Sequence, residues 1–189
     1  MDTNLEQEIK KDSPKVAPIK VDGTEVFEHG EDTATAEGIE NGVKPTNLTA
    51  KGREYAKEVG LHAKEAEKKK VVSSAVQRAK ETATIISKTA KIPHEINKTL
   101  NTWNIGDFDG DKQGSFDEKY WTSNPDKEPP NGESFNSFTG RMERAYKHTL
   151  AAPKSEQIIT HSKVTRAFLA LRETGGKWND KTTKLFLSL

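Results

Sequence analysis

The stretch TEVFEHGED, from Thr24 to Asp32, combines a β-prone run with a histidine and a glycine at its end. Glycine lets the chain turn sharply out of a strand, so we expect a strand over 24–27 that ends at His29. A second β-prone run, QIIT over 157–160, leads in the same way into His161 and Ser162. Two histidines that each follow a strand indicate phosphoryl chemistry.

Helical patterns separate these strands and continue beyond them. Apolar residues recur every three or four positions over 49–70, 77–91, 134–150 and 163–174. Further β-prone runs lie at 71–72 and 95–100, and we expect a last strand at 184–189. This alternation predicts an α/β fold, a three-layer sandwich whose mostly parallel central sheet is flanked by helices.

The length of 189 residues suits one globular domain. Residues 1–22 are charged, contain Pro14 and Pro18, and show no helical or strand period. We therefore expect a flexible N-terminal arm over 1–22 and a single domain over 23–189. The segments 30–47 and 101–132 are rich in turn-forming residues and predict long loops, the second of which is expected to shape selectivity.

The composition excludes several kinds of site and partner. Thirty basic and twenty-nine acidic residues give a net charge of +1, which argues against a nucleic acid bound through charge. The chain has no cysteine, which excludes disulfides and thiolate metal sites. Apolar runs are far shorter than the roughly 18 to 20 residues of a membrane span, and residues 1–20 lack the apolar core of a secretory signal. We expect a cytoplasmic protein without membrane contact, cofactor or metal.

Ligands bind at the carboxyl ends of the strands in sheets of this type, so the residues at those ends form the candidate site. His29, the pair Ser73-Ser74, the loop after Leu100 and His161 all lie at such ends. A single histidine is more often an exposed loop residue than part of a site. The matching settings of His29 and His161 favour one common pocket.

Taken together, the motifs resemble the histidine phosphatase superfamily, which has the phosphoglycerate mutase-like fold. The resemblance runs from about Thr24 to Ala170. It rests, in chain order, on FEHGED (27–32), NLTAKGREYA (47–56), SSAVQRAKETA (73–83), IGDFDG (105–110), PNGESF (130–135) and ITHSKVTRA (159–167). Each motif alone is weak, but their order and spacing are specific. The Ser-Ser turn followed by Gln77-Arg78-Ala79 is the most diagnostic.

The resemblance implies that a histidine takes up a phosphoryl group. Carried over by position, His29 is the nucleophile, His161 is the second imidazole, and Arg78 clamps the phosphate oxygens. Such donors are needed because charge spreads over three oxygens in the transition state. Gly30, Ser162 and Glu133 are further phosphate-binding candidates. Glu133 has a second interpretation, because a carboxylate also favours the start of a helix.

Two positions depart from the family's pattern. The family's first motif begins with arginine, and this chain has Glu28 there. At about 4 Å and an effective dielectric near 20, two like charges repel by roughly 4 kcal/mol, so phosphate is bound more weakly. Many members carry a glutamate acid where this chain has Thr102, and threonine cannot act as an acid near neutral pH. Acid phosphatases of this family carry an aspartate directly after the second histidine, and this chain has Ser162 at that position.

Two functions remain open on these residues. In the first, the protein is a phosphatase or mutase that acts on a small phosphomonoester through a phosphohistidine at His29. Glu28, partly desolvated, is then the acid, and activity favours acidic pH. In the second, the pocket is catalytically inactive, Glu28, His29 and Arg78 form a polar network, and the domain binds a protein partner or serves as a structural module. A homo-oligomer is open in both cases. A nucleotide-binding domain is disfavoured because no glycine-rich phosphate loop follows a strand.

Overall fold

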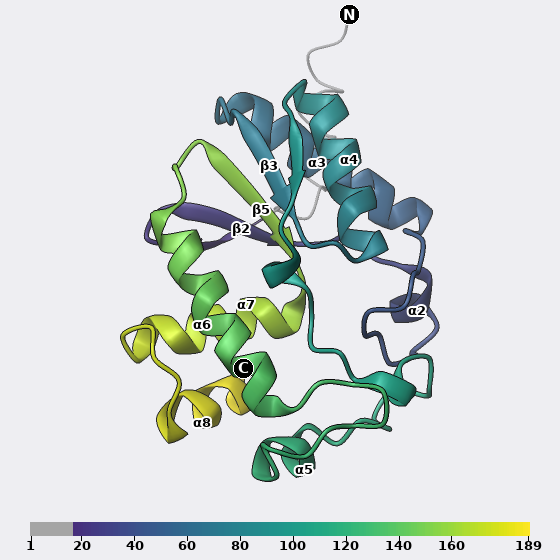
Figure 1. Ribbon diagram of the computed structural model, residues 1–189. Helices are drawn as coiled ribbons and strands as arrows, with labels where there is room; N and C mark the ends of the chain where they lie inside the picture. The colour runs from purple at the N-terminus through teal and green to yellow at the C-terminus, as the bar shows by residue number, and fades with distance from the viewer. Residues whose placement is uncertain (1–16) are drawn as a thin grey trace, which may run out of the picture.

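The computed structural model describes residues 17–189, and five strands in this part form one sheet in the order β1-β2-β5-β3-β4 (Figure 1). The first strand pairs antiparallel with the second, and all other neighbours pair in parallel. The strands are β1 (Ile19–Val21), β2 (Thr24–Glu28), β3 (Lys70–Ser73), β4 (His94–Ile96) and β5 (Glu156–Thr160). The mostly parallel sheet predicted from the alternating pattern is confirmed.

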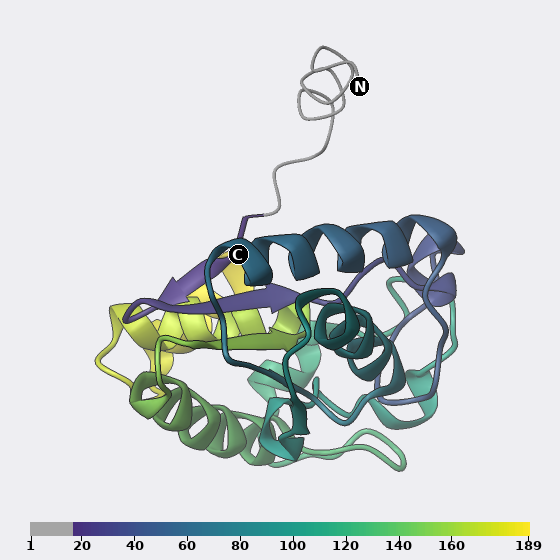
Figure 2. The same ribbon diagram turned by 90° about the horizontal axis from the view of Figure 1, so that it is seen from above.

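Helices cover both faces of this sheet, which gives the three predicted layers. Figure 2 shows α3 above the strands and α6 below them. The longer helices are α3 (Ala50–Glu65), α4 (Gln77–Ala90), α6 (Phe135–Ala151), α7 (Ser162–Glu173) and α8 (Asp180–Ser188). The short ones are α2 (Thr33–Ala36), α5 (Glu118–Ser123) and the 3₁₀ turns Lys98–Leu100 and Gly106–Phe108. Between residues 17 and 189, none of the helices is long and apolar enough to cross a membrane.

The alternation of side chains along each strand divides the core into two clusters. Val26 and Ile158 are register partners and pack against the side of α6 and α7. The next pair, Phe27 and Ile159, points to the opposite face and packs against α3 and α4. The strand ends are thereby held from both sides.

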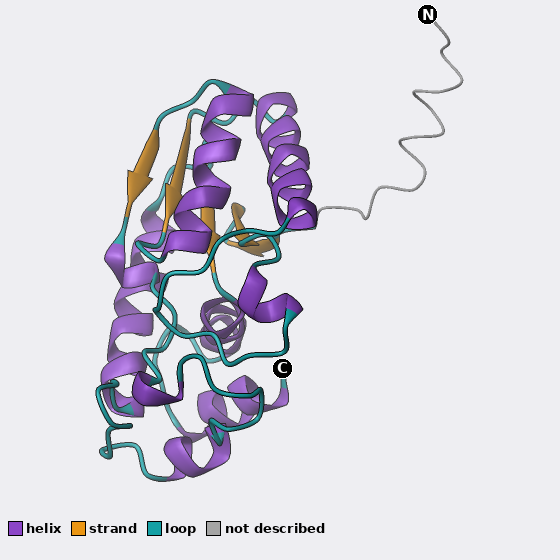
Figure 3. Ribbon diagram, turned by 90° about the vertical axis from the view of Figure 1, so that its right-hand side faces the viewer, coloured by secondary structure: helices purple, strands orange, loops and turns teal. Residues whose placement is uncertain are grey.

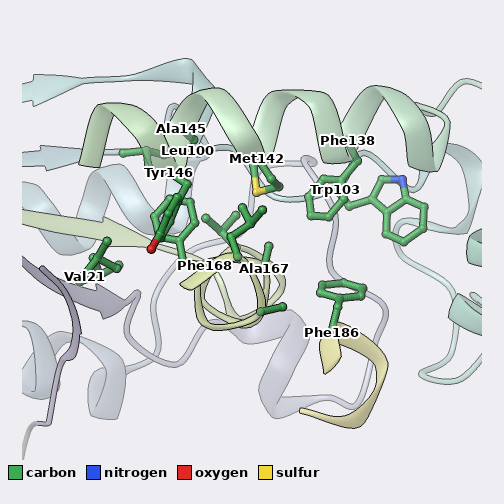
Figure 4. Packing of buried hydrophobic residues seen from close by; sticks show 14 of the residues in the cluster. Val21, Leu100, Trp103, Phe138, Met142, Ala145, Tyr146, Ala167, Phe168 and Phe186 are labelled. Atoms are coloured by element: carbon green, nitrogen blue, oxygen red, sulfur yellow. The ribbon is translucent and has the colours of Figure 1, made fainter. Parts of the chain in front are cut away.

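The larger cluster also anchors the long loop that follows β4. Trp103 is fully buried, and its ring stacks on Phe138 of α6 with centroids 5.2 Å apart. Figure 4 shows both rings beside Met142, with Phe186 of α8 facing them. The first residues of the loop are therefore part of the core, which fixes the backbone at Thr102.

Three expectations need correction. The arm predicted for 1–22 does not reach residue 22, because Ile19–Val21 form the edge strand β1 and Val21 is buried; residues 1–16 lie outside the described part. The run at 95–100 is a strand only to Ile96, after which Asn97 caps a 3₁₀ turn. The strand predicted for 184–189 is wrong. The segment belongs to α8, which Asn179 and Thr182 begin with a capping box, a signal upstream of the apolar run.

Candidate functional site

A pocket of about 350 Å³ opens at the carboxyl ends of the parallel strands. Figure 3 shows the strand arrows pointing toward the loops that gather at this end. Its lining includes His29, which follows β2, Arg78 from the first turn of α4, and His161, which follows β5. The sheet therefore brings together residues that are far apart in the sequence, as the strand-end argument predicted.

The imidazole of His29 is held as a neutral ring with one nitrogen facing Arg78. Its Nδ1 lies 2.7 Å from the carbonyl oxygen of Gly30, so Nδ1 carries the proton. Its Nε2 accepts a 2.9 Å hydrogen bond from Nε of Arg78. Burial, assisted by the charge of Arg78, lowers the pKa of His29 to about 4. Near neutral pH the ring is therefore uncharged and Nε2 has a lone pair, as a nucleophile requires.

Gly30 positions this histidine through its backbone. Its N–H donates to Oγ1 of Thr82 over 3.1 Å, and a Cβ at Gly30 would lie 2.3 Å from the carbonyl oxygen of Gly52 in α3. The loop after β2 and helix α3 thus touch backbone to backbone. This close approach is the reason for the glycine that the sequence places after His29.

Arg78 lies in the first turn of α4 and is 1% exposed. Its Nη2 donates to the carbonyl oxygen of Gly42 over 2.9 Å, while Nη1 is buried and has no hydrogen-bond partner among residues 17–189. Burial lowers the pKa of Arg78 to about 10, so the guanidinium stays protonated near neutral pH. It has donors left for an anion in the pocket.

Asp32 supplies a negative charge near this guanidinium, with Oδ2 of Asp32 3.8 Å from Nε of Arg78. Burial opposes the ionisation of Asp32, but hydrogen bonds from Thr35, Thr46 and Asn41 outweigh it and hold the pKa of Asp32 below its usual value. The same bonds fasten the loop that follows α2. The carboxylate therefore orients both the loop and the arginine.

His161 is 2% exposed, and its ring centroid lies 5.1 Å from that of His29. Oγ of Ser74 is 2.7 Å from Nε2 of His161 and accepts from the N–H of Val76, which leaves the hydroxyl proton free to be donated to Nε2. The pattern assigns the proton of His161 to Nδ1, which has no hydrogen-bond partner among residues 17–189. Burial, with the charges nearby, lowers the pKa of His161 well below its usual value.

Glu28 lines the same pocket but is exposed, so the partial burial expected for an acid at this position is absent. Its Oε1 accepts a 2.7 Å hydrogen bond from Oγ1 of Thr165. Thr102, which is 2% exposed, also lines the pocket, at the position where the resemblance implies an acid. Ser162 also lines the pocket, as the first residue of α7.

Glu133 is the one phosphate-binding candidate that is not among the residues lining the pocket. Its carboxylate accepts the backbone N–H of Asn104 over 3.0 Å and forms an ion pair with Arg141 of α6. The helix cap is the next residue, Ser134, whose side chain accepts from the N–H of Ser137. Glu133 thus ties the long loop to the start of α6 rather than reaching the phosphate position.

Asn41 and Lys163 line the pocket and Asp32 lies beside Arg78, and none of these roles was predicted from the sequence. Lys163 was visible two positions after His161, and its Nζ lies 3.4 Å from Oε1 of Glu118. Glu118 already binds Arg166 at 2.9 Å, so two cations share one carboxylate. No local signal marks Asp32 or Asn41, because their roles depend on how the loop folds over Arg78.

Known proteins are similar to this chain in sequence and in fold. The adenosylcobalamin/alpha-ribazole phosphatase of Salmonella typhimurium is 30% identical over 151 residues, 75% of this chain and 75% of that protein. The metal-independent phosphoserine phosphatase of Arabidopsis thaliana is 28% identical over 183 residues, 87% of this chain and 74% of that protein. The crystal structure of the alpha-ribazole phosphatase from Shigella flexneri superposes with a TM-score of 0.68 at 25% identity, covering 87% of this chain and 83% of that one. The profile of the histidine phosphatase superfamily (branch 1) matches residues 27–181, and the chain belongs to that family.

Proposed function

We propose that this protein hydrolyses small phosphomonoesters through a phosphohistidine at His29. One observation carries the proposal. The neutral Nε2 of His29 shares a pocket with two buried groups whose N–H bonds are unpaired among residues 17–189, Nη1 of Arg78 and Nδ1 of His161. A nucleophile beside unpaired donors is what phosphoryl transfer needs.

In the first step Nε2 of His29 attacks phosphorus. The P–N bond forms, the P–O bond to the alcohol breaks, and the departing oxygen takes a proton from water. Arg78 and His161 donate to the phosphoryl oxygens, on which charge spreads in the transition state. In the second step water attacks phosphorus and gives a proton to the hydroxide left from the first step, the P–N bond breaks, and phosphate leaves with His29 neutral again. The hydrogen bond from Nδ1 to Gly30 stabilises the positive ring of the intermediate.

The choice of substrate class draws on the relatives as well as on the pocket. The proteins named above are an adenosylcobalamin/alpha-ribazole phosphatase and a phosphoserine phosphatase. A pocket of about 350 Å³ suits a phosphate ester of similar size. The catalytically inactive alternative has no support in these comparisons.

The experiment that tests the proposal is turnover of p-nitrophenyl phosphate by the full chain between pH 4 and 8. We expect His29→Ala to abolish release of phosphate, because it removes the neutral imidazole nitrogen that faces the guanidinium of Arg78. His148→Ala is the matched control, since His148 is exposed on α6 and outside the pocket, and it should keep the activity.

A second measurement identifies the intermediate. Brief incubation with ³²P-labelled substrate followed by quenching in alkali should leave label on the protein that is lost in acid, the stability expected of phosphohistidine. The label should be absent from His29→Ala. Turnover that survives in His29→Ala would contradict the proposal, and so would label that resists acid.

A further inference from the structure

We infer that Glu28 selects phosphomonoesters whose alcohol carries an ammonium group close to the ester oxygen. The inference rests on the proposed function, because it takes the phosphoryl group to lie at His29, Arg78 and His161. It assigns to Glu28 the recognition of the leaving group rather than a proton transfer.

The charges that line the pocket are the first observation. Three carboxylates face two basic side chains, and the two histidines are neutral: the charged residues are Glu28, Glu31, Glu40, Arg78 and Lys163. A dianionic ester entering this pocket therefore meets more negative than positive charge. A positive charge on the ligand therefore strengthens its binding in this pocket.

Glu28 is the carboxylate that is left to meet such a charge. Glu31 is engaged by Oγ1 of Thr49 and by Lys51 at 3.5 Å, and Glu40 accepts two backbone N–H groups of the long loop. Glu28 has only the hydroxyl of Thr165, and no basic side chain among residues 17–189 lies within 4 Å of it. It lines the same pocket as the nucleophile, so a cation bound by it lies near the reacting phosphorus.

The buried donors fix which end of the substrate reaches Glu28. Nη1 of Arg78 and Nδ1 of His161 belong to side chains that are 1% and 2% exposed, and both nitrogens lack a partner among residues 17–189. They take the phosphoryl oxygens at the inner end of the pocket. Glu28 is exposed, so it faces the alcohol portion at the outer end. Oδ1 of Asn41, buried and equally without a partner, is a second acceptor for an N–H group.

The same ammonium group offsets the missing acid. Thr102 stands where an acid would protonate the departing oxygen, and threonine cannot do so near neutral pH. A positive charge held near that oxygen stabilises the negative charge that develops on it as the P–O bond breaks. The ammonium group of the substrate thus compensates for both departures from the family's pattern, the carboxylate at Glu28 and the missing acid at Thr102.

Binding of inert analogues tests the inference apart from catalysis. Two phosphonates of the same shape, 2-aminoethylphosphonate and propylphosphonate, differ only in an ammonium against a methyl group. Calorimetric titration of the full chain in EDTA at pH 7 should show about tenfold tighter binding of the amino compound. EDTA removes divalent cations, which would otherwise bridge Glu28 and the phosphonate.

Two variants locate the preference. Glu28→Gln should remove it, because the uncharged amide attracts the ammonium only weakly, and Glu28→Arg should reverse it. Glu31→Gln is the matched control, a carboxylate of the same pocket already engaged by Lys51, and it should keep the preference. Equal affinities of the unmodified protein for the two phosphonates would overturn the inference, as would a preference that persists in Glu28→Gln.

Turnover then separates this inference from the proposed function. Phosphoethanolamine should be hydrolysed about tenfold faster than propyl phosphate, measured as kcat/KM. If both esters are hydrolysed at the same rate through labelled His29, the function stands and the inference is wrong. If the amino phosphonate binds preferentially but no ester is hydrolysed and no label appears, the inference stands and the proposed function is wrong.

Discussion

Nε of Arg78 donates a 2.9 Å hydrogen bond to Nε2 of His29, the nitrogen assigned as the nucleophile. The lone pair that would attack phosphorus is therefore occupied by the guanidinium that would hold the phosphate. An incoming phosphoryl group has to replace this bond, with the donor passing from the ring to a phosphate oxygen. The pairing also keeps the imidazole uncharged, because the cation beside it opposes protonation.

Stability should fall as the pH is lowered through the range in which histidine normally titrates. In the unfolded chain His29 and His161 protonate near pH 6.5, whereas burial lowers the pKa of His29 to about 4 and that of His161 well below its usual value. Between about pH 6.5 and 4 the unfolded state binds up to two more protons than the native state at these positions. The free energy of unfolding, measured by urea titration at each pH, should therefore decrease as the pH is lowered. Its slope against pH should be proportional to this difference in bound protons.

His29→Asn and His161→Asn are the variants that test this assignment. In each variant, the slope of the unfolding free energy between pH 6.5 and 4 should correspond to about one proton fewer, because asparagine does not titrate. Burial also lowers the pKa of His94, which adds to the same slope and is unchanged in both variants. Asp32, Glu25 and Glu118 also have a lowered pKa, but their stabilisation is lost only as the pH falls further, through their lowered folded-state values. An unchanged slope in both variants would contradict the assignment.

Ser74→Ala should reduce activity about tenfold without loss of fold, because the hydroxyl of Ser74 holds the proton of His161 on Nδ1. ¹⁵N shifts of the imidazole should report a mixture of tautomers in this variant. The matched control is Ser73→Ala. Ser73 makes a similar 2.7 Å contact with Nε2 of His94, which does not line the pocket. An equal loss of activity in both variants would show that the effect is only structural.

The sequence predicted the sheet, the main helices and three of the residues that meet in the pocket, His29, Arg78 and His161. The sheet and the helices follow from local periodicity, His29 and His161 follow from their places after β-prone runs, and Arg78 follows from the motif that carries the family resemblance. The roles of Asp32 and Asn41 were not predicted because their contacts depend on the path of a loop. The last strand was predicted wrongly because the apolar run at 184–189 fits the period of a strand as well as that of a helix. The helix cap that decides between the two, Asn179, lies outside this run.

Glu133 and Glu28 show where a family pattern does not determine a role. Glu133 carries its motif but faces Arg141 and Asn104, and only the packing of the loop on α6 decides this. For Glu28, the acid role required partial burial, and exposure follows from the position of the side chain at the mouth of the pocket. Neither the burial nor the partners of a side chain can be read from its neighbours in sequence.

Gly52→Ala should destabilise the protein by about 1–3 kcal/mol and weaken activity as well. A Cβ at Gly52 would lie 2.0 Å from the carbonyl oxygen of Glu31, so α3 would have to move away from the loop that carries His29. Gly140→Ala is the control, a helical glycine of α6 whose added Cβ meets only Nη1 of Arg144 at 3.7 Å. It should stabilise by up to about 1 kcal/mol through helix propensity. Equal unfolding free energies for the two variants would contradict the proposed contact.

Thr102→Glu should restore a proton donor for the departing oxygen. Thr102 lines the pocket and its backbone carbonyl is fixed by Arg141, so a carboxyl group at this position enters the pocket from a rigid loop. Burial there favours the protonated form, which is the form an acid needs. We expect the rate with propyl phosphate, a poor leaving group, to rise at least about tenfold. The rate with p-nitrophenyl phosphate, whose leaving group departs as an anion, should change little. An equal change with both esters would mean that Glu at this position affects phosphate binding and not proton transfer, and the thermal unfolding midpoint of the variant shows whether the fold is kept.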